Sequence, residues 1–300
     1  MTIHVKTLPD NVTDQTQRSP GRPDLRQTLM RLGMDWYARL SPEGAGRLVN
    51  RQFFKPGRLP MPYRYESLLD VADSHTQLHH GTNILPIYSW GEGPTILMVH
   101  GWSGAGIQFG AYIEPLVKAG FRAVLFDAPA HGRAQGSSTN LYEIAEVVKR
   151  VGVNHGPVHG IIAHSMGSVA AARAISRGLD VRNLVMLAPP SDLQTVVHGL
   201  GRRLKLPANV LQVHKRLIEE RFGTDVWSEL SLVRLAGQLT QRGLVVIDSD
   251  DRDVPPAQSH EVHLAWPGGH VLHTRGLGHH RMLWNPDVVK AVIGAVASPA

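Results

Sequence analysis

The stretch Gly160-Ile161-Ile162-Ala163-His164-Ser165-Met166-Gly167-Ser168 joins an apolar run to an alanine-rich one. The residues before Ser165 are apolar enough for a buried strand, and residues 169–175 have high helix propensity. A strand, a sharp turn and a helix form the setting of a nucleophile elbow, which lifts a serine oxygen above the sheet edge. Its usual pattern is G-x-S-x-G, and Ala163 replaces the first glycine. We therefore predict that Ser165 is a nucleophile, although such a serine can also be a helix N-cap.

The size and composition suit a single α/β domain with an extension. The chain has 300 residues, 42% of them hydrophobic, which is enough to bury a sizeable core. It has no long apolar run and no apolar segment near its first residue, so we expect neither a membrane span nor a secretory signal. The absence of cysteine excludes disulfides and thiolate metal sites. A cytoplasmic location is the default expectation.

The basic character of the chain is confined to its first part. Residues 1–64 hold eleven Lys and Arg against five Asp and Glu, which accounts for the whole net charge of +6. No surface pattern of basic side chains interleaved with stacking aromatic residues is present. We therefore expect no nucleic-acid partner.

The N-terminal part divides into a tail and a helical extension. Residues 1–24 are polar and rich in proline and glycine, which predicts a flexible tail. Residues 25–75 are predicted to be an amphipathic helical extension and linker, with a second helix starting at Ser41-Pro42. The apolar stripe of the first helix is expected to pack on the body while the arginines face water, its members being Leu25, Leu29, Leu32, Trp36 and Leu40. Alternatively, the basic helices lie on a membrane surface or cover the active site.

Residues 76–300 are predicted to form the main domain. Apolar strands at 84–90, 95–100, 122–126, 158–163, 183–188, 244–247 and 271–274 alternate with helical segments. Such alternation predicts an α/β fold with a mostly parallel sheet covered by helices on both faces. The alternation breaks at about 190–242, where helices at 210–222 and 230–239 predict a small helical lid.

Polar residues follow several of these strands. His100-Gly101-Trp102 follows one, where the backbone N–H of Trp102 could pair with that of Met166 to hold an oxyanion. A loop that begins Asp127-Ala128-Pro129 follows the next. The strand after the insert leads to Asp251, and the last strand leads to Gly276-Leu277-Gly278-His279. An acid and a base are thus placed after Ser165 in the chain.

The order Ser165, Asp251, His279 and these five motifs resemble the α/β-hydrolase superfamily, over roughly residues 76–298. The resemblance implies that His279 accepts the proton of Ser165 and that Asp251 holds the histidine tautomer. It also implies an oxyanion hole at the N–H groups of Trp102 and Met166. The helical extension and short lid are similar to those of a group of bacterial α/β-hydrolases.

Several carboxylates are candidates for the role of the acid. Asp251 stands three residues before Val254-Pro255, as the family's acid does. Other carboxylates compete with it, namely Asp248, Asp250, Asp253 and Asp192.

The remaining motif residues favour structural roles. We expect His100 and His164 to shape the oxyanion loop and the elbow through hydrogen bonds, and Asp127 to bind amides of its own loop. The seventeen histidines include no set with metal-ligand spacing, so neither a metal nor a cofactor is expected.

The predicted function is hydrolysis of a small-molecule carboxylic ester, with a short or medium acyl group, through an acyl-serine intermediate. Thioesterase, lactonase and C–C bond hydrolase activity would use the same three residues. An alternative of another class is a ligand-binding or signalling protein of the same fold with little turnover. The sequence leaves the oligomeric state open.

Overall fold

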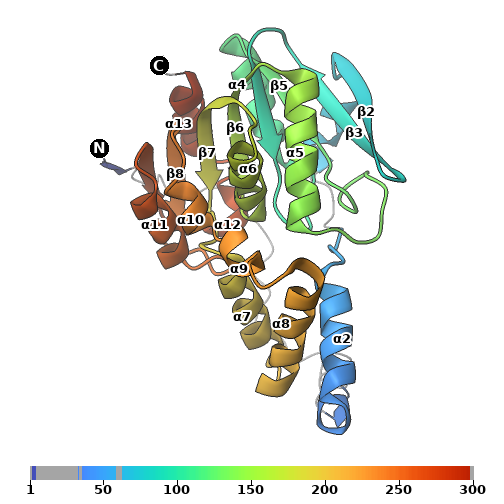
Figure 1. Cartoon of the computed structure of the whole chain (residues 1–300). Coiled ribbons are helices and arrows are strands. Elements are labelled where there is room, and N and C mark those ends of the chain that lie inside the picture. Colours follow the sequence, from blue (N-terminus) through green and yellow to red (C-terminus); the bar gives the residue numbers. More distant parts are fainter. Residues whose placement is uncertain (1, 5–32, 34–35, 59–62, 298–300) are drawn as a thin grey trace. The chain divides into compact units, whose positions relative to one another are not determined.

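The computed structural model describes residues 2–4, 33, 36–58 and 63–297 (Figure 1). The chain divides into two compact units. The first, which we call the sheet unit, comprises Met1–Val5, Phe54–Leu193 and Trp227–Ala300. The second, the helical unit, comprises Lys6–Phe53 and Gln194–Val226. The middle of the predicted insert therefore forms one unit with the N-terminal extension.

The sheet unit contains a nine-stranded sheet with the order β1-β9-β8-β7-β6-β4-β5-β3-β2. Strands β1 and β4 to β9 run parallel to one another. At one edge, β3 pairs antiparallel with β5 and β2 pairs antiparallel with β3. The strands are β1 (Thr2–His4), β2 (Ser74–His80), β3 (Asn83–Trp90), β4 (Thr95–Val99), β5 (Arg122–Phe126), β6 (Val158–His164), β7 (Val181–Leu187), β8 (Arg242–Asp248) and β9 (Gly269–Thr274). The predicted mostly parallel α/β sheet is confirmed.

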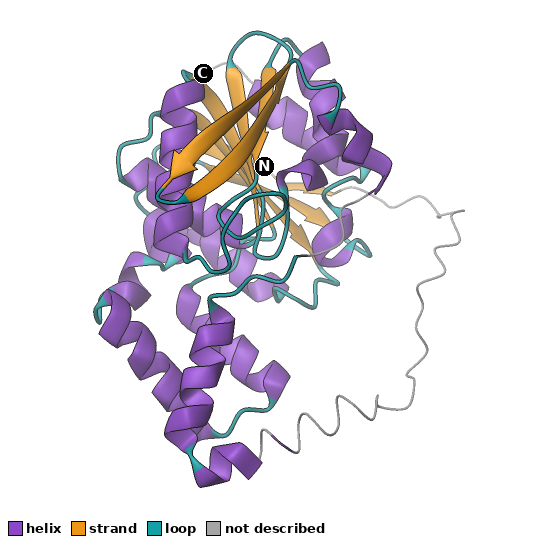
Figure 2. Ribbon diagram, turned by 90° about the vertical axis from the view of Figure 1, so that its right-hand side faces the viewer, coloured by secondary structure: helices purple, strands orange, loops and turns teal. Residues whose placement is uncertain are grey.

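Helices lie on both sides of this twisted sheet (Figure 2). Contacts pair α5 with α6, α10 with α6 and α11, and α4 with α13. The α-helices of the sheet unit are α3 (Tyr63–Glu66), α4 (Gly110–Lys118), α5 (Leu141–His155), α6 (Met166–Ser176), α9 (Val226–Glu229, beginning at the unit boundary), α10 (Leu232–Ala236), α11 (Pro256–Ala265), α12 (Gly278–Arg281) and α13 (Pro286–Ala297). Two 3₁₀ turns, η1 (Ser67–Leu69) and η2 (Gly106–Phe109), precede β2 and α4. Within the described residues, no helix is long and apolar enough to cross a bilayer.

The parallel strands end at one edge of the sheet, because parallel neighbours share a direction. The last residues of five of them are Val99, Phe126, His164, Asp248 and Thr274. The loops that follow carry the motifs singled out in the sequence. In open α/β sheets, ligands bind outside this carboxyl edge.

The helical unit is built from α2 (Pro42–Phe53), α7 (Leu193–Leu204) and α8 (Ala208–Phe222), with α2 packed on α8. Ser41 caps α2 as predicted, since its Oγ accepts a hydrogen bond of 3.1 Å from the N–H of Gly44. Small side chains of the two segments, Ala45, Val49 and Val210, form a buried cluster with Ala38. Helix α7 was not predicted from the sequence.

Two predictions for the N-terminal part are wrong where the structure describes it. Thr2–His4 pair with β9 instead of belonging to a flexible tail, because the edge of β9 offers backbone partners. Trp36 and Leu40 are 65% and 78% exposed, so the apolar stripe does not pack there. Ala38 is buried instead, in a cluster with Ala45 and Val210. Leu25, Leu29, Leu32 and most of residues 1–24 lie outside the described residues.

Candidate active site

Ser165 lies at a strained turn between β6 and α6. Its φ and ψ angles are 53° and −127°, a region that residues with a side chain rarely adopt. The surrounding sheet holds the turn in place, because the N–H of Ser165 donates to the carbonyl of Leu187 at 2.8 Å. Strain of this kind costs about 1–3 kcal/mol and persists where the surroundings enforce it. The predicted strand, turn and helix are therefore present, with Ser165 at the turn.

Two glycines let the backbone approach the serine. A Cβ on Gly167 would lie 2.5 Å from the carbonyl oxygen of Val99 and 2.6 Å from that of His100. A Cβ on Gly101 would lie 3.0 Å from the Cβ of Ser165. The loop that precedes Trp102 thus runs directly beside Ser165. Met166 is the first residue of α6, where backbone N–H groups have no partner within a helix.

His279 and Asp251 form a hydrogen-bonded pair. The Nδ1 atom of His279 lies 2.8 Å from Oδ2 of Asp251, and both side chains are largely buried. The other oxygen of Asp251 accepts from the N–H groups of Asp253 and Val254, each at 2.9 Å. An ionised carboxylate only accepts, so Nδ1 carries the proton and Nε2 can accept one.

His164 connects this pair to the elbow. Its Nε2 donates to the carbonyl oxygen of His279 at 2.9 Å. The ring centroids of His164 and His279 are 4.6 Å apart. His164 immediately precedes Ser165, so this bond ties the loop of the histidine to the nucleophile turn. Burial lowers the pKa of His164 well below its usual range, which keeps the ring neutral. Its predicted shaping role agrees with this contact.

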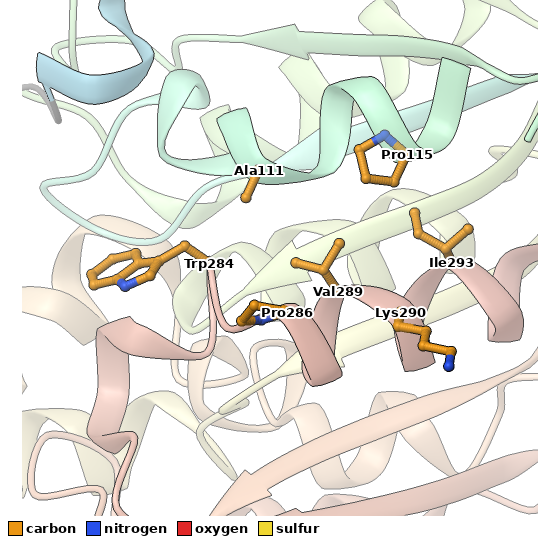
Figure 3. Close-up of a pocket in the computed structure, with 7 residues that line it drawn as sticks. All are labelled: Ala111, Pro115, Trp284, Pro286, Val289, Lys290 and Ile293. Atoms are coloured by element: carbon orange, nitrogen blue, oxygen red, sulfur yellow. The ribbon is translucent and has the colours of Figure 1, made fainter. Parts of the chain in front are cut away.

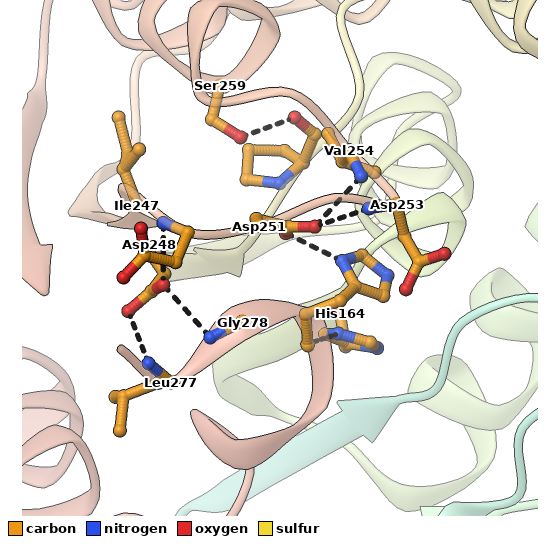
Figure 4. A network of polar contacts seen from close by, with 12 residues as sticks. His164, Ile247, Asp248, Asp251, Asp253, Val254, Ser259, Leu277 and Gly278 are labelled. Carbon is orange, nitrogen blue, oxygen red and sulfur yellow. Dashed lines mark hydrogen bonds and ion pairs between the residues drawn. The ribbon is translucent and has the colours of Figure 1, made fainter. Parts of the chain in front are cut away.

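Asp248 holds the loop that carries His279 (Figure 4). Its side chain is buried and accepts four hydrogen bonds, from the N–H groups of Asp250, Leu277 and Gly278 and from the hydroxyl of Thr274. The distances are 2.8 to 3.0 Å. Asp248 therefore ties the end of β8 to the turn before α12, and its oxygens are occupied by these donors.

The other carboxylates proposed as alternatives lie elsewhere. Asp250 and Asp253 are exposed. Asp192 forms an isolated β-bridge with Ser231. Of the five carboxylates proposed from the sequence, Asp251 is the one that the structure places in a hydrogen bond with His279.

The loop after β5 is fixed by its own polar residues. Asp127 accepts from the N–H groups of Gly106 at 2.8 Å and Arg133 at 2.7 Å, and burial raises its pKa. Nε2 of His100 accepts from the N–H of Ala128, so this ring joins the loops after β4 and β5. Burial lowers the pKa of His100 to about 4. The structural roles predicted for Asp127 and His100 match these contacts.

The comparisons with known proteins agree with this architecture. Residues 94–213, which include Trp102 and Ser165, match the family model described as alpha/beta hydrolase fold. A pimeloyl-[acyl-carrier protein] methyl ester esterase of Xanthomonas axonopodis pv. citri (strain 306) is 24% identical over 245 residues, 68% of this chain and 94% of the relative. The chain has the α/β-hydrolase fold, and it matches that family over these residues.

Solved structures of α/β-hydrolases show the same fold. A thioesterase domain from the curacin biosynthetic pathway superposes with a TM-score of 0.56 at 17% identity, over 75% of this chain and 99% of that one. An esterase from Exiguobacterium antarcticum gives a TM-score of 0.57 at 14% identity, over 75% of this chain and all of the other.

A separate pocket lies between α4 and α13 of the α/β-hydrolase fold (Figure 3). It has a volume of 420 Å³ and is apolar except for Lys290, and it is lined by Ala111, Pro115, Trp284, Pro286, Val289, Lys290 and Ile293. None of the predicted site residues belongs to this lining.

In the described part of the chain, no three His, Asp or Glu side chains are arranged to hold a metal ion.

Sequence reasoning missed the two links that set the position of His279. Asp248 was weighed only as an alternative acid, and His164 only as part of the elbow. Asp248 is the last residue of a buried strand, and this position was a signal in the sequence, because a buried carboxylate needs several hydrogen-bond donors. The link from His164 to the backbone of His279 joins residues 115 positions apart and left no signal in the sequence.

Proposed function

We propose that the protein is a serine hydrolase of carboxylic esters, with Ser165 as nucleophile, His279 as base and Asp251 as the acid that orients it. The observation that carries the proposal is the His279–Asp251 hydrogen bond of 2.8 Å, at the sheet edge where Ser165 occupies its strained turn. The match of residues 94–213 to the α/β-hydrolase family supports it, and the relatives described above are named as esterases and a thioesterase.

The reaction proceeds through an acyl-serine. Nε2 of His279 takes the proton from the hydroxyl of Ser165 as its oxygen attacks the ester carbonyl. The N–H groups of Trp102 and Met166 stabilise the oxyanion, and the alcohol leaves with the proton held by His279. Water then attacks the acyl group by the same steps in reverse, which releases the carboxylic acid and restores Ser165. These reaction steps require neither a metal ion nor a cofactor.

We propose short or medium acyl groups as substrates, because the indole of Trp102 adjoins the serine loop. Trp102 packs edge-on against His131 with ring centroids 5.3 Å apart, which restricts the indole. Thioesters, lactones and C–C bonds activated by a carbonyl remain candidate substrates of the same residues. A ligand-binding protein with little turnover is the alternative of another class.

Hydrolysis of p-nitrophenyl butyrate, p-nitrophenyl palmitate and a butyryl thioester by the wild type and Ser165→Ala tests the proposal. We expect butyrate to be cleaved faster than palmitate, and Ser165→Ala to lose about 10³-fold or more in kcat. Much faster cleavage of palmitate would contradict the acyl-length proposal. Equal rates in the two proteins would contradict Ser165 as nucleophile. Saturable ligand binding without product would favour the binding protein.

A further inference from the structure

One end of the helical unit carries exposed apolar side chains. Trp36, Leu40 and Leu204 are 65%, 78% and 47% exposed. Trp36 and Leu40 are four residues apart in helical backbone, so they lie on one face. Ala38, between them, packs in one cluster with Val210, near the start of α8. This contact puts the Trp36–Leu40 segment beside the turn that joins α7 to α8, and Leu204 is the last residue of α7 before that turn.

The same end is positively charged. Four exposed basic residues lie in these two segments, Arg39, Arg202, Arg203 and Lys205. We call the surface formed by these four residues with Trp36, Leu40 and Leu204 the tip.

The described part of the helical unit has nine Lys and Arg against four Asp and Glu, a net charge of +5. Three of its acidic residues lie at or beyond the last turn of α8, away from the tip: Glu219, Glu220 and Asp225. The fourth, Glu43, is ion-paired with Arg47 at 3.1 Å and with Arg216 at 2.5 Å. The positive charge of the tip is therefore not balanced by a local carboxylate in this part of the unit.

The turn itself holds a lysine where glycine is favoured. Lys205 has a φ of 52°, and its N–H donates to Arg202 O at 3.2 Å as the helix ends. Helices commonly end with a glycine in this left-handed conformation, because a Cβ is strained there. A residue that violates local preference on an exposed turn is expected where its side chain has a function.

We propose that the tip docks the protein on an anionic lipid surface. Tryptophan and leucine beside arginine and lysine are typical of segments that lie in the membrane interface. Basic residues near such a surface are attracted by the negative potential of anionic headgroups. A second copy of this chain fits the tip less well, because two tips would bring like charges together.

Co-sedimentation of the full-length protein with vesicles tests the proposal, and it needs no substrate. We expect binding to vesicles of phosphatidylcholine with phosphatidylglycerol, little binding to phosphatidylcholine alone, and weaker binding as salt is raised. Equal binding to the two kinds of vesicle would overturn the anionic-lipid proposal.

Variants of exposed residues locate the surface. Arg202→Gln with Arg203→Gln should weaken binding about 30-fold, and Trp36→Ala with Leu40→Ser about ten-fold or more. Lys205→Gly should also weaken binding while it relieves the backbone, so loss of binding would not reflect unfolding.

Controls with the same chemistry lie on the sheet unit, where Leu264 is 82% exposed. Leu264→Ser, and Arg182→Gln with Lys290→Gln, should leave vesicle binding unchanged. Unchanged binding by the tip variants, or equal losses in the controls, would overturn the proposal. So would a concentration-dependent dimer that the tip variants dissociate, since a second copy would then occupy the surface.

Discussion

Three buried carboxylates of the sheet unit and one buried histidine of the helical unit differ in their hydrogen bonding. In the sheet unit, the buried carboxylates of Asp127, Asp248 and Asp251 each accept two or more hydrogen bonds. In the helical unit, His214 is fully buried with no hydrogen-bond partner for either ring nitrogen, its ring edge-on to Phe53 at 4.9 Å. The hydrogen bonds of the carboxylates fix the loops that carry the site residues, whereas His214 is held by packing contacts such as that with Phe53. Changes to the carboxylates should therefore alter catalysis, and changes at His214 should alter stability.

The largest expected effect is that of Asp251→Asn. The amide would present an NH₂ group to Nδ1 of His279 and so favour the wrong tautomer, which should lower kcat by about 10⁴-fold. The kcat for p-nitrophenyl butyrate measures this loss, with Asp180→Asn as a control on an exposed carboxylate. A loss of less than ten-fold would remove Asp251 from the acid role.

Asp248→Asn should have a smaller effect on the same pair. Its amide nitrogen cannot accept from the N–H of Leu277 or the hydroxyl of Thr274, so the loop of His279 should shift. A displacement of this kind is expected to lower kcat by about 10- to 100-fold with little change in KM.

The unsatisfied donors in Asp248→Asn should also lower the free energy of unfolding by about 1–3 kcal/mol. Steady-state kinetics and urea unfolding measure the two effects. Loss of stability with an unchanged kcat would show that Asp248 does not position His279.

His214 should make the helical unit sensitive to acid. Burial lowers its pKa from 6.5 to about 4, so below pH 6.5 the unfolded chain binds a proton that the folded unit does not. The contribution of neutral His214 to the free energy of unfolding is complete above pH 6.5. It falls by on the order of 3 kcal/mol as the pH is lowered towards 4.

Hydrogen exchange of the peptides in α2 and α8 at pH 7 and pH 5 measures this loss, after correction for intrinsic rates. His214→Leu cannot titrate and should flatten the dependence. The same dependence in wild type and variant would assign the acid sensitivity to other groups.

Local patterns predicted the sheet unit well for a physical reason. The strand–turn–helix around Ser165 depends on neighbours in the sequence, and buried strands such as β6 and β8 have an apolar middle. The partner of His279 was open among five carboxylates. Four of them, Asp248, Asp250, Asp251 and Asp253, are close neighbours in the sequence, and spacing alone does not set the directions of their side chains.

The organisation of the helical unit depends on contacts between distant segments. Helix α2 packs on α8, and the two are joined by small side chains that carry no distinctive pattern, such as Ala45 and Val210. The sequence predicted both helices but could not show that they share a core. Trp36 and Leu40 fit an amphipathic stripe equally well whether they are buried or exposed, so their exposure required the structure.

The most direct test of the central claim is labelling with a reactive phosphonate followed by peptide mass spectrometry. We expect one covalent adduct, on Ser165, formed quickly by the wild type and by Asp180→Asn. It also predicts slow labelling of His279→Ala, because the base is missing. A folded protein that gives no adduct, or an adduct on another residue, would contradict Ser165 as the nucleophile.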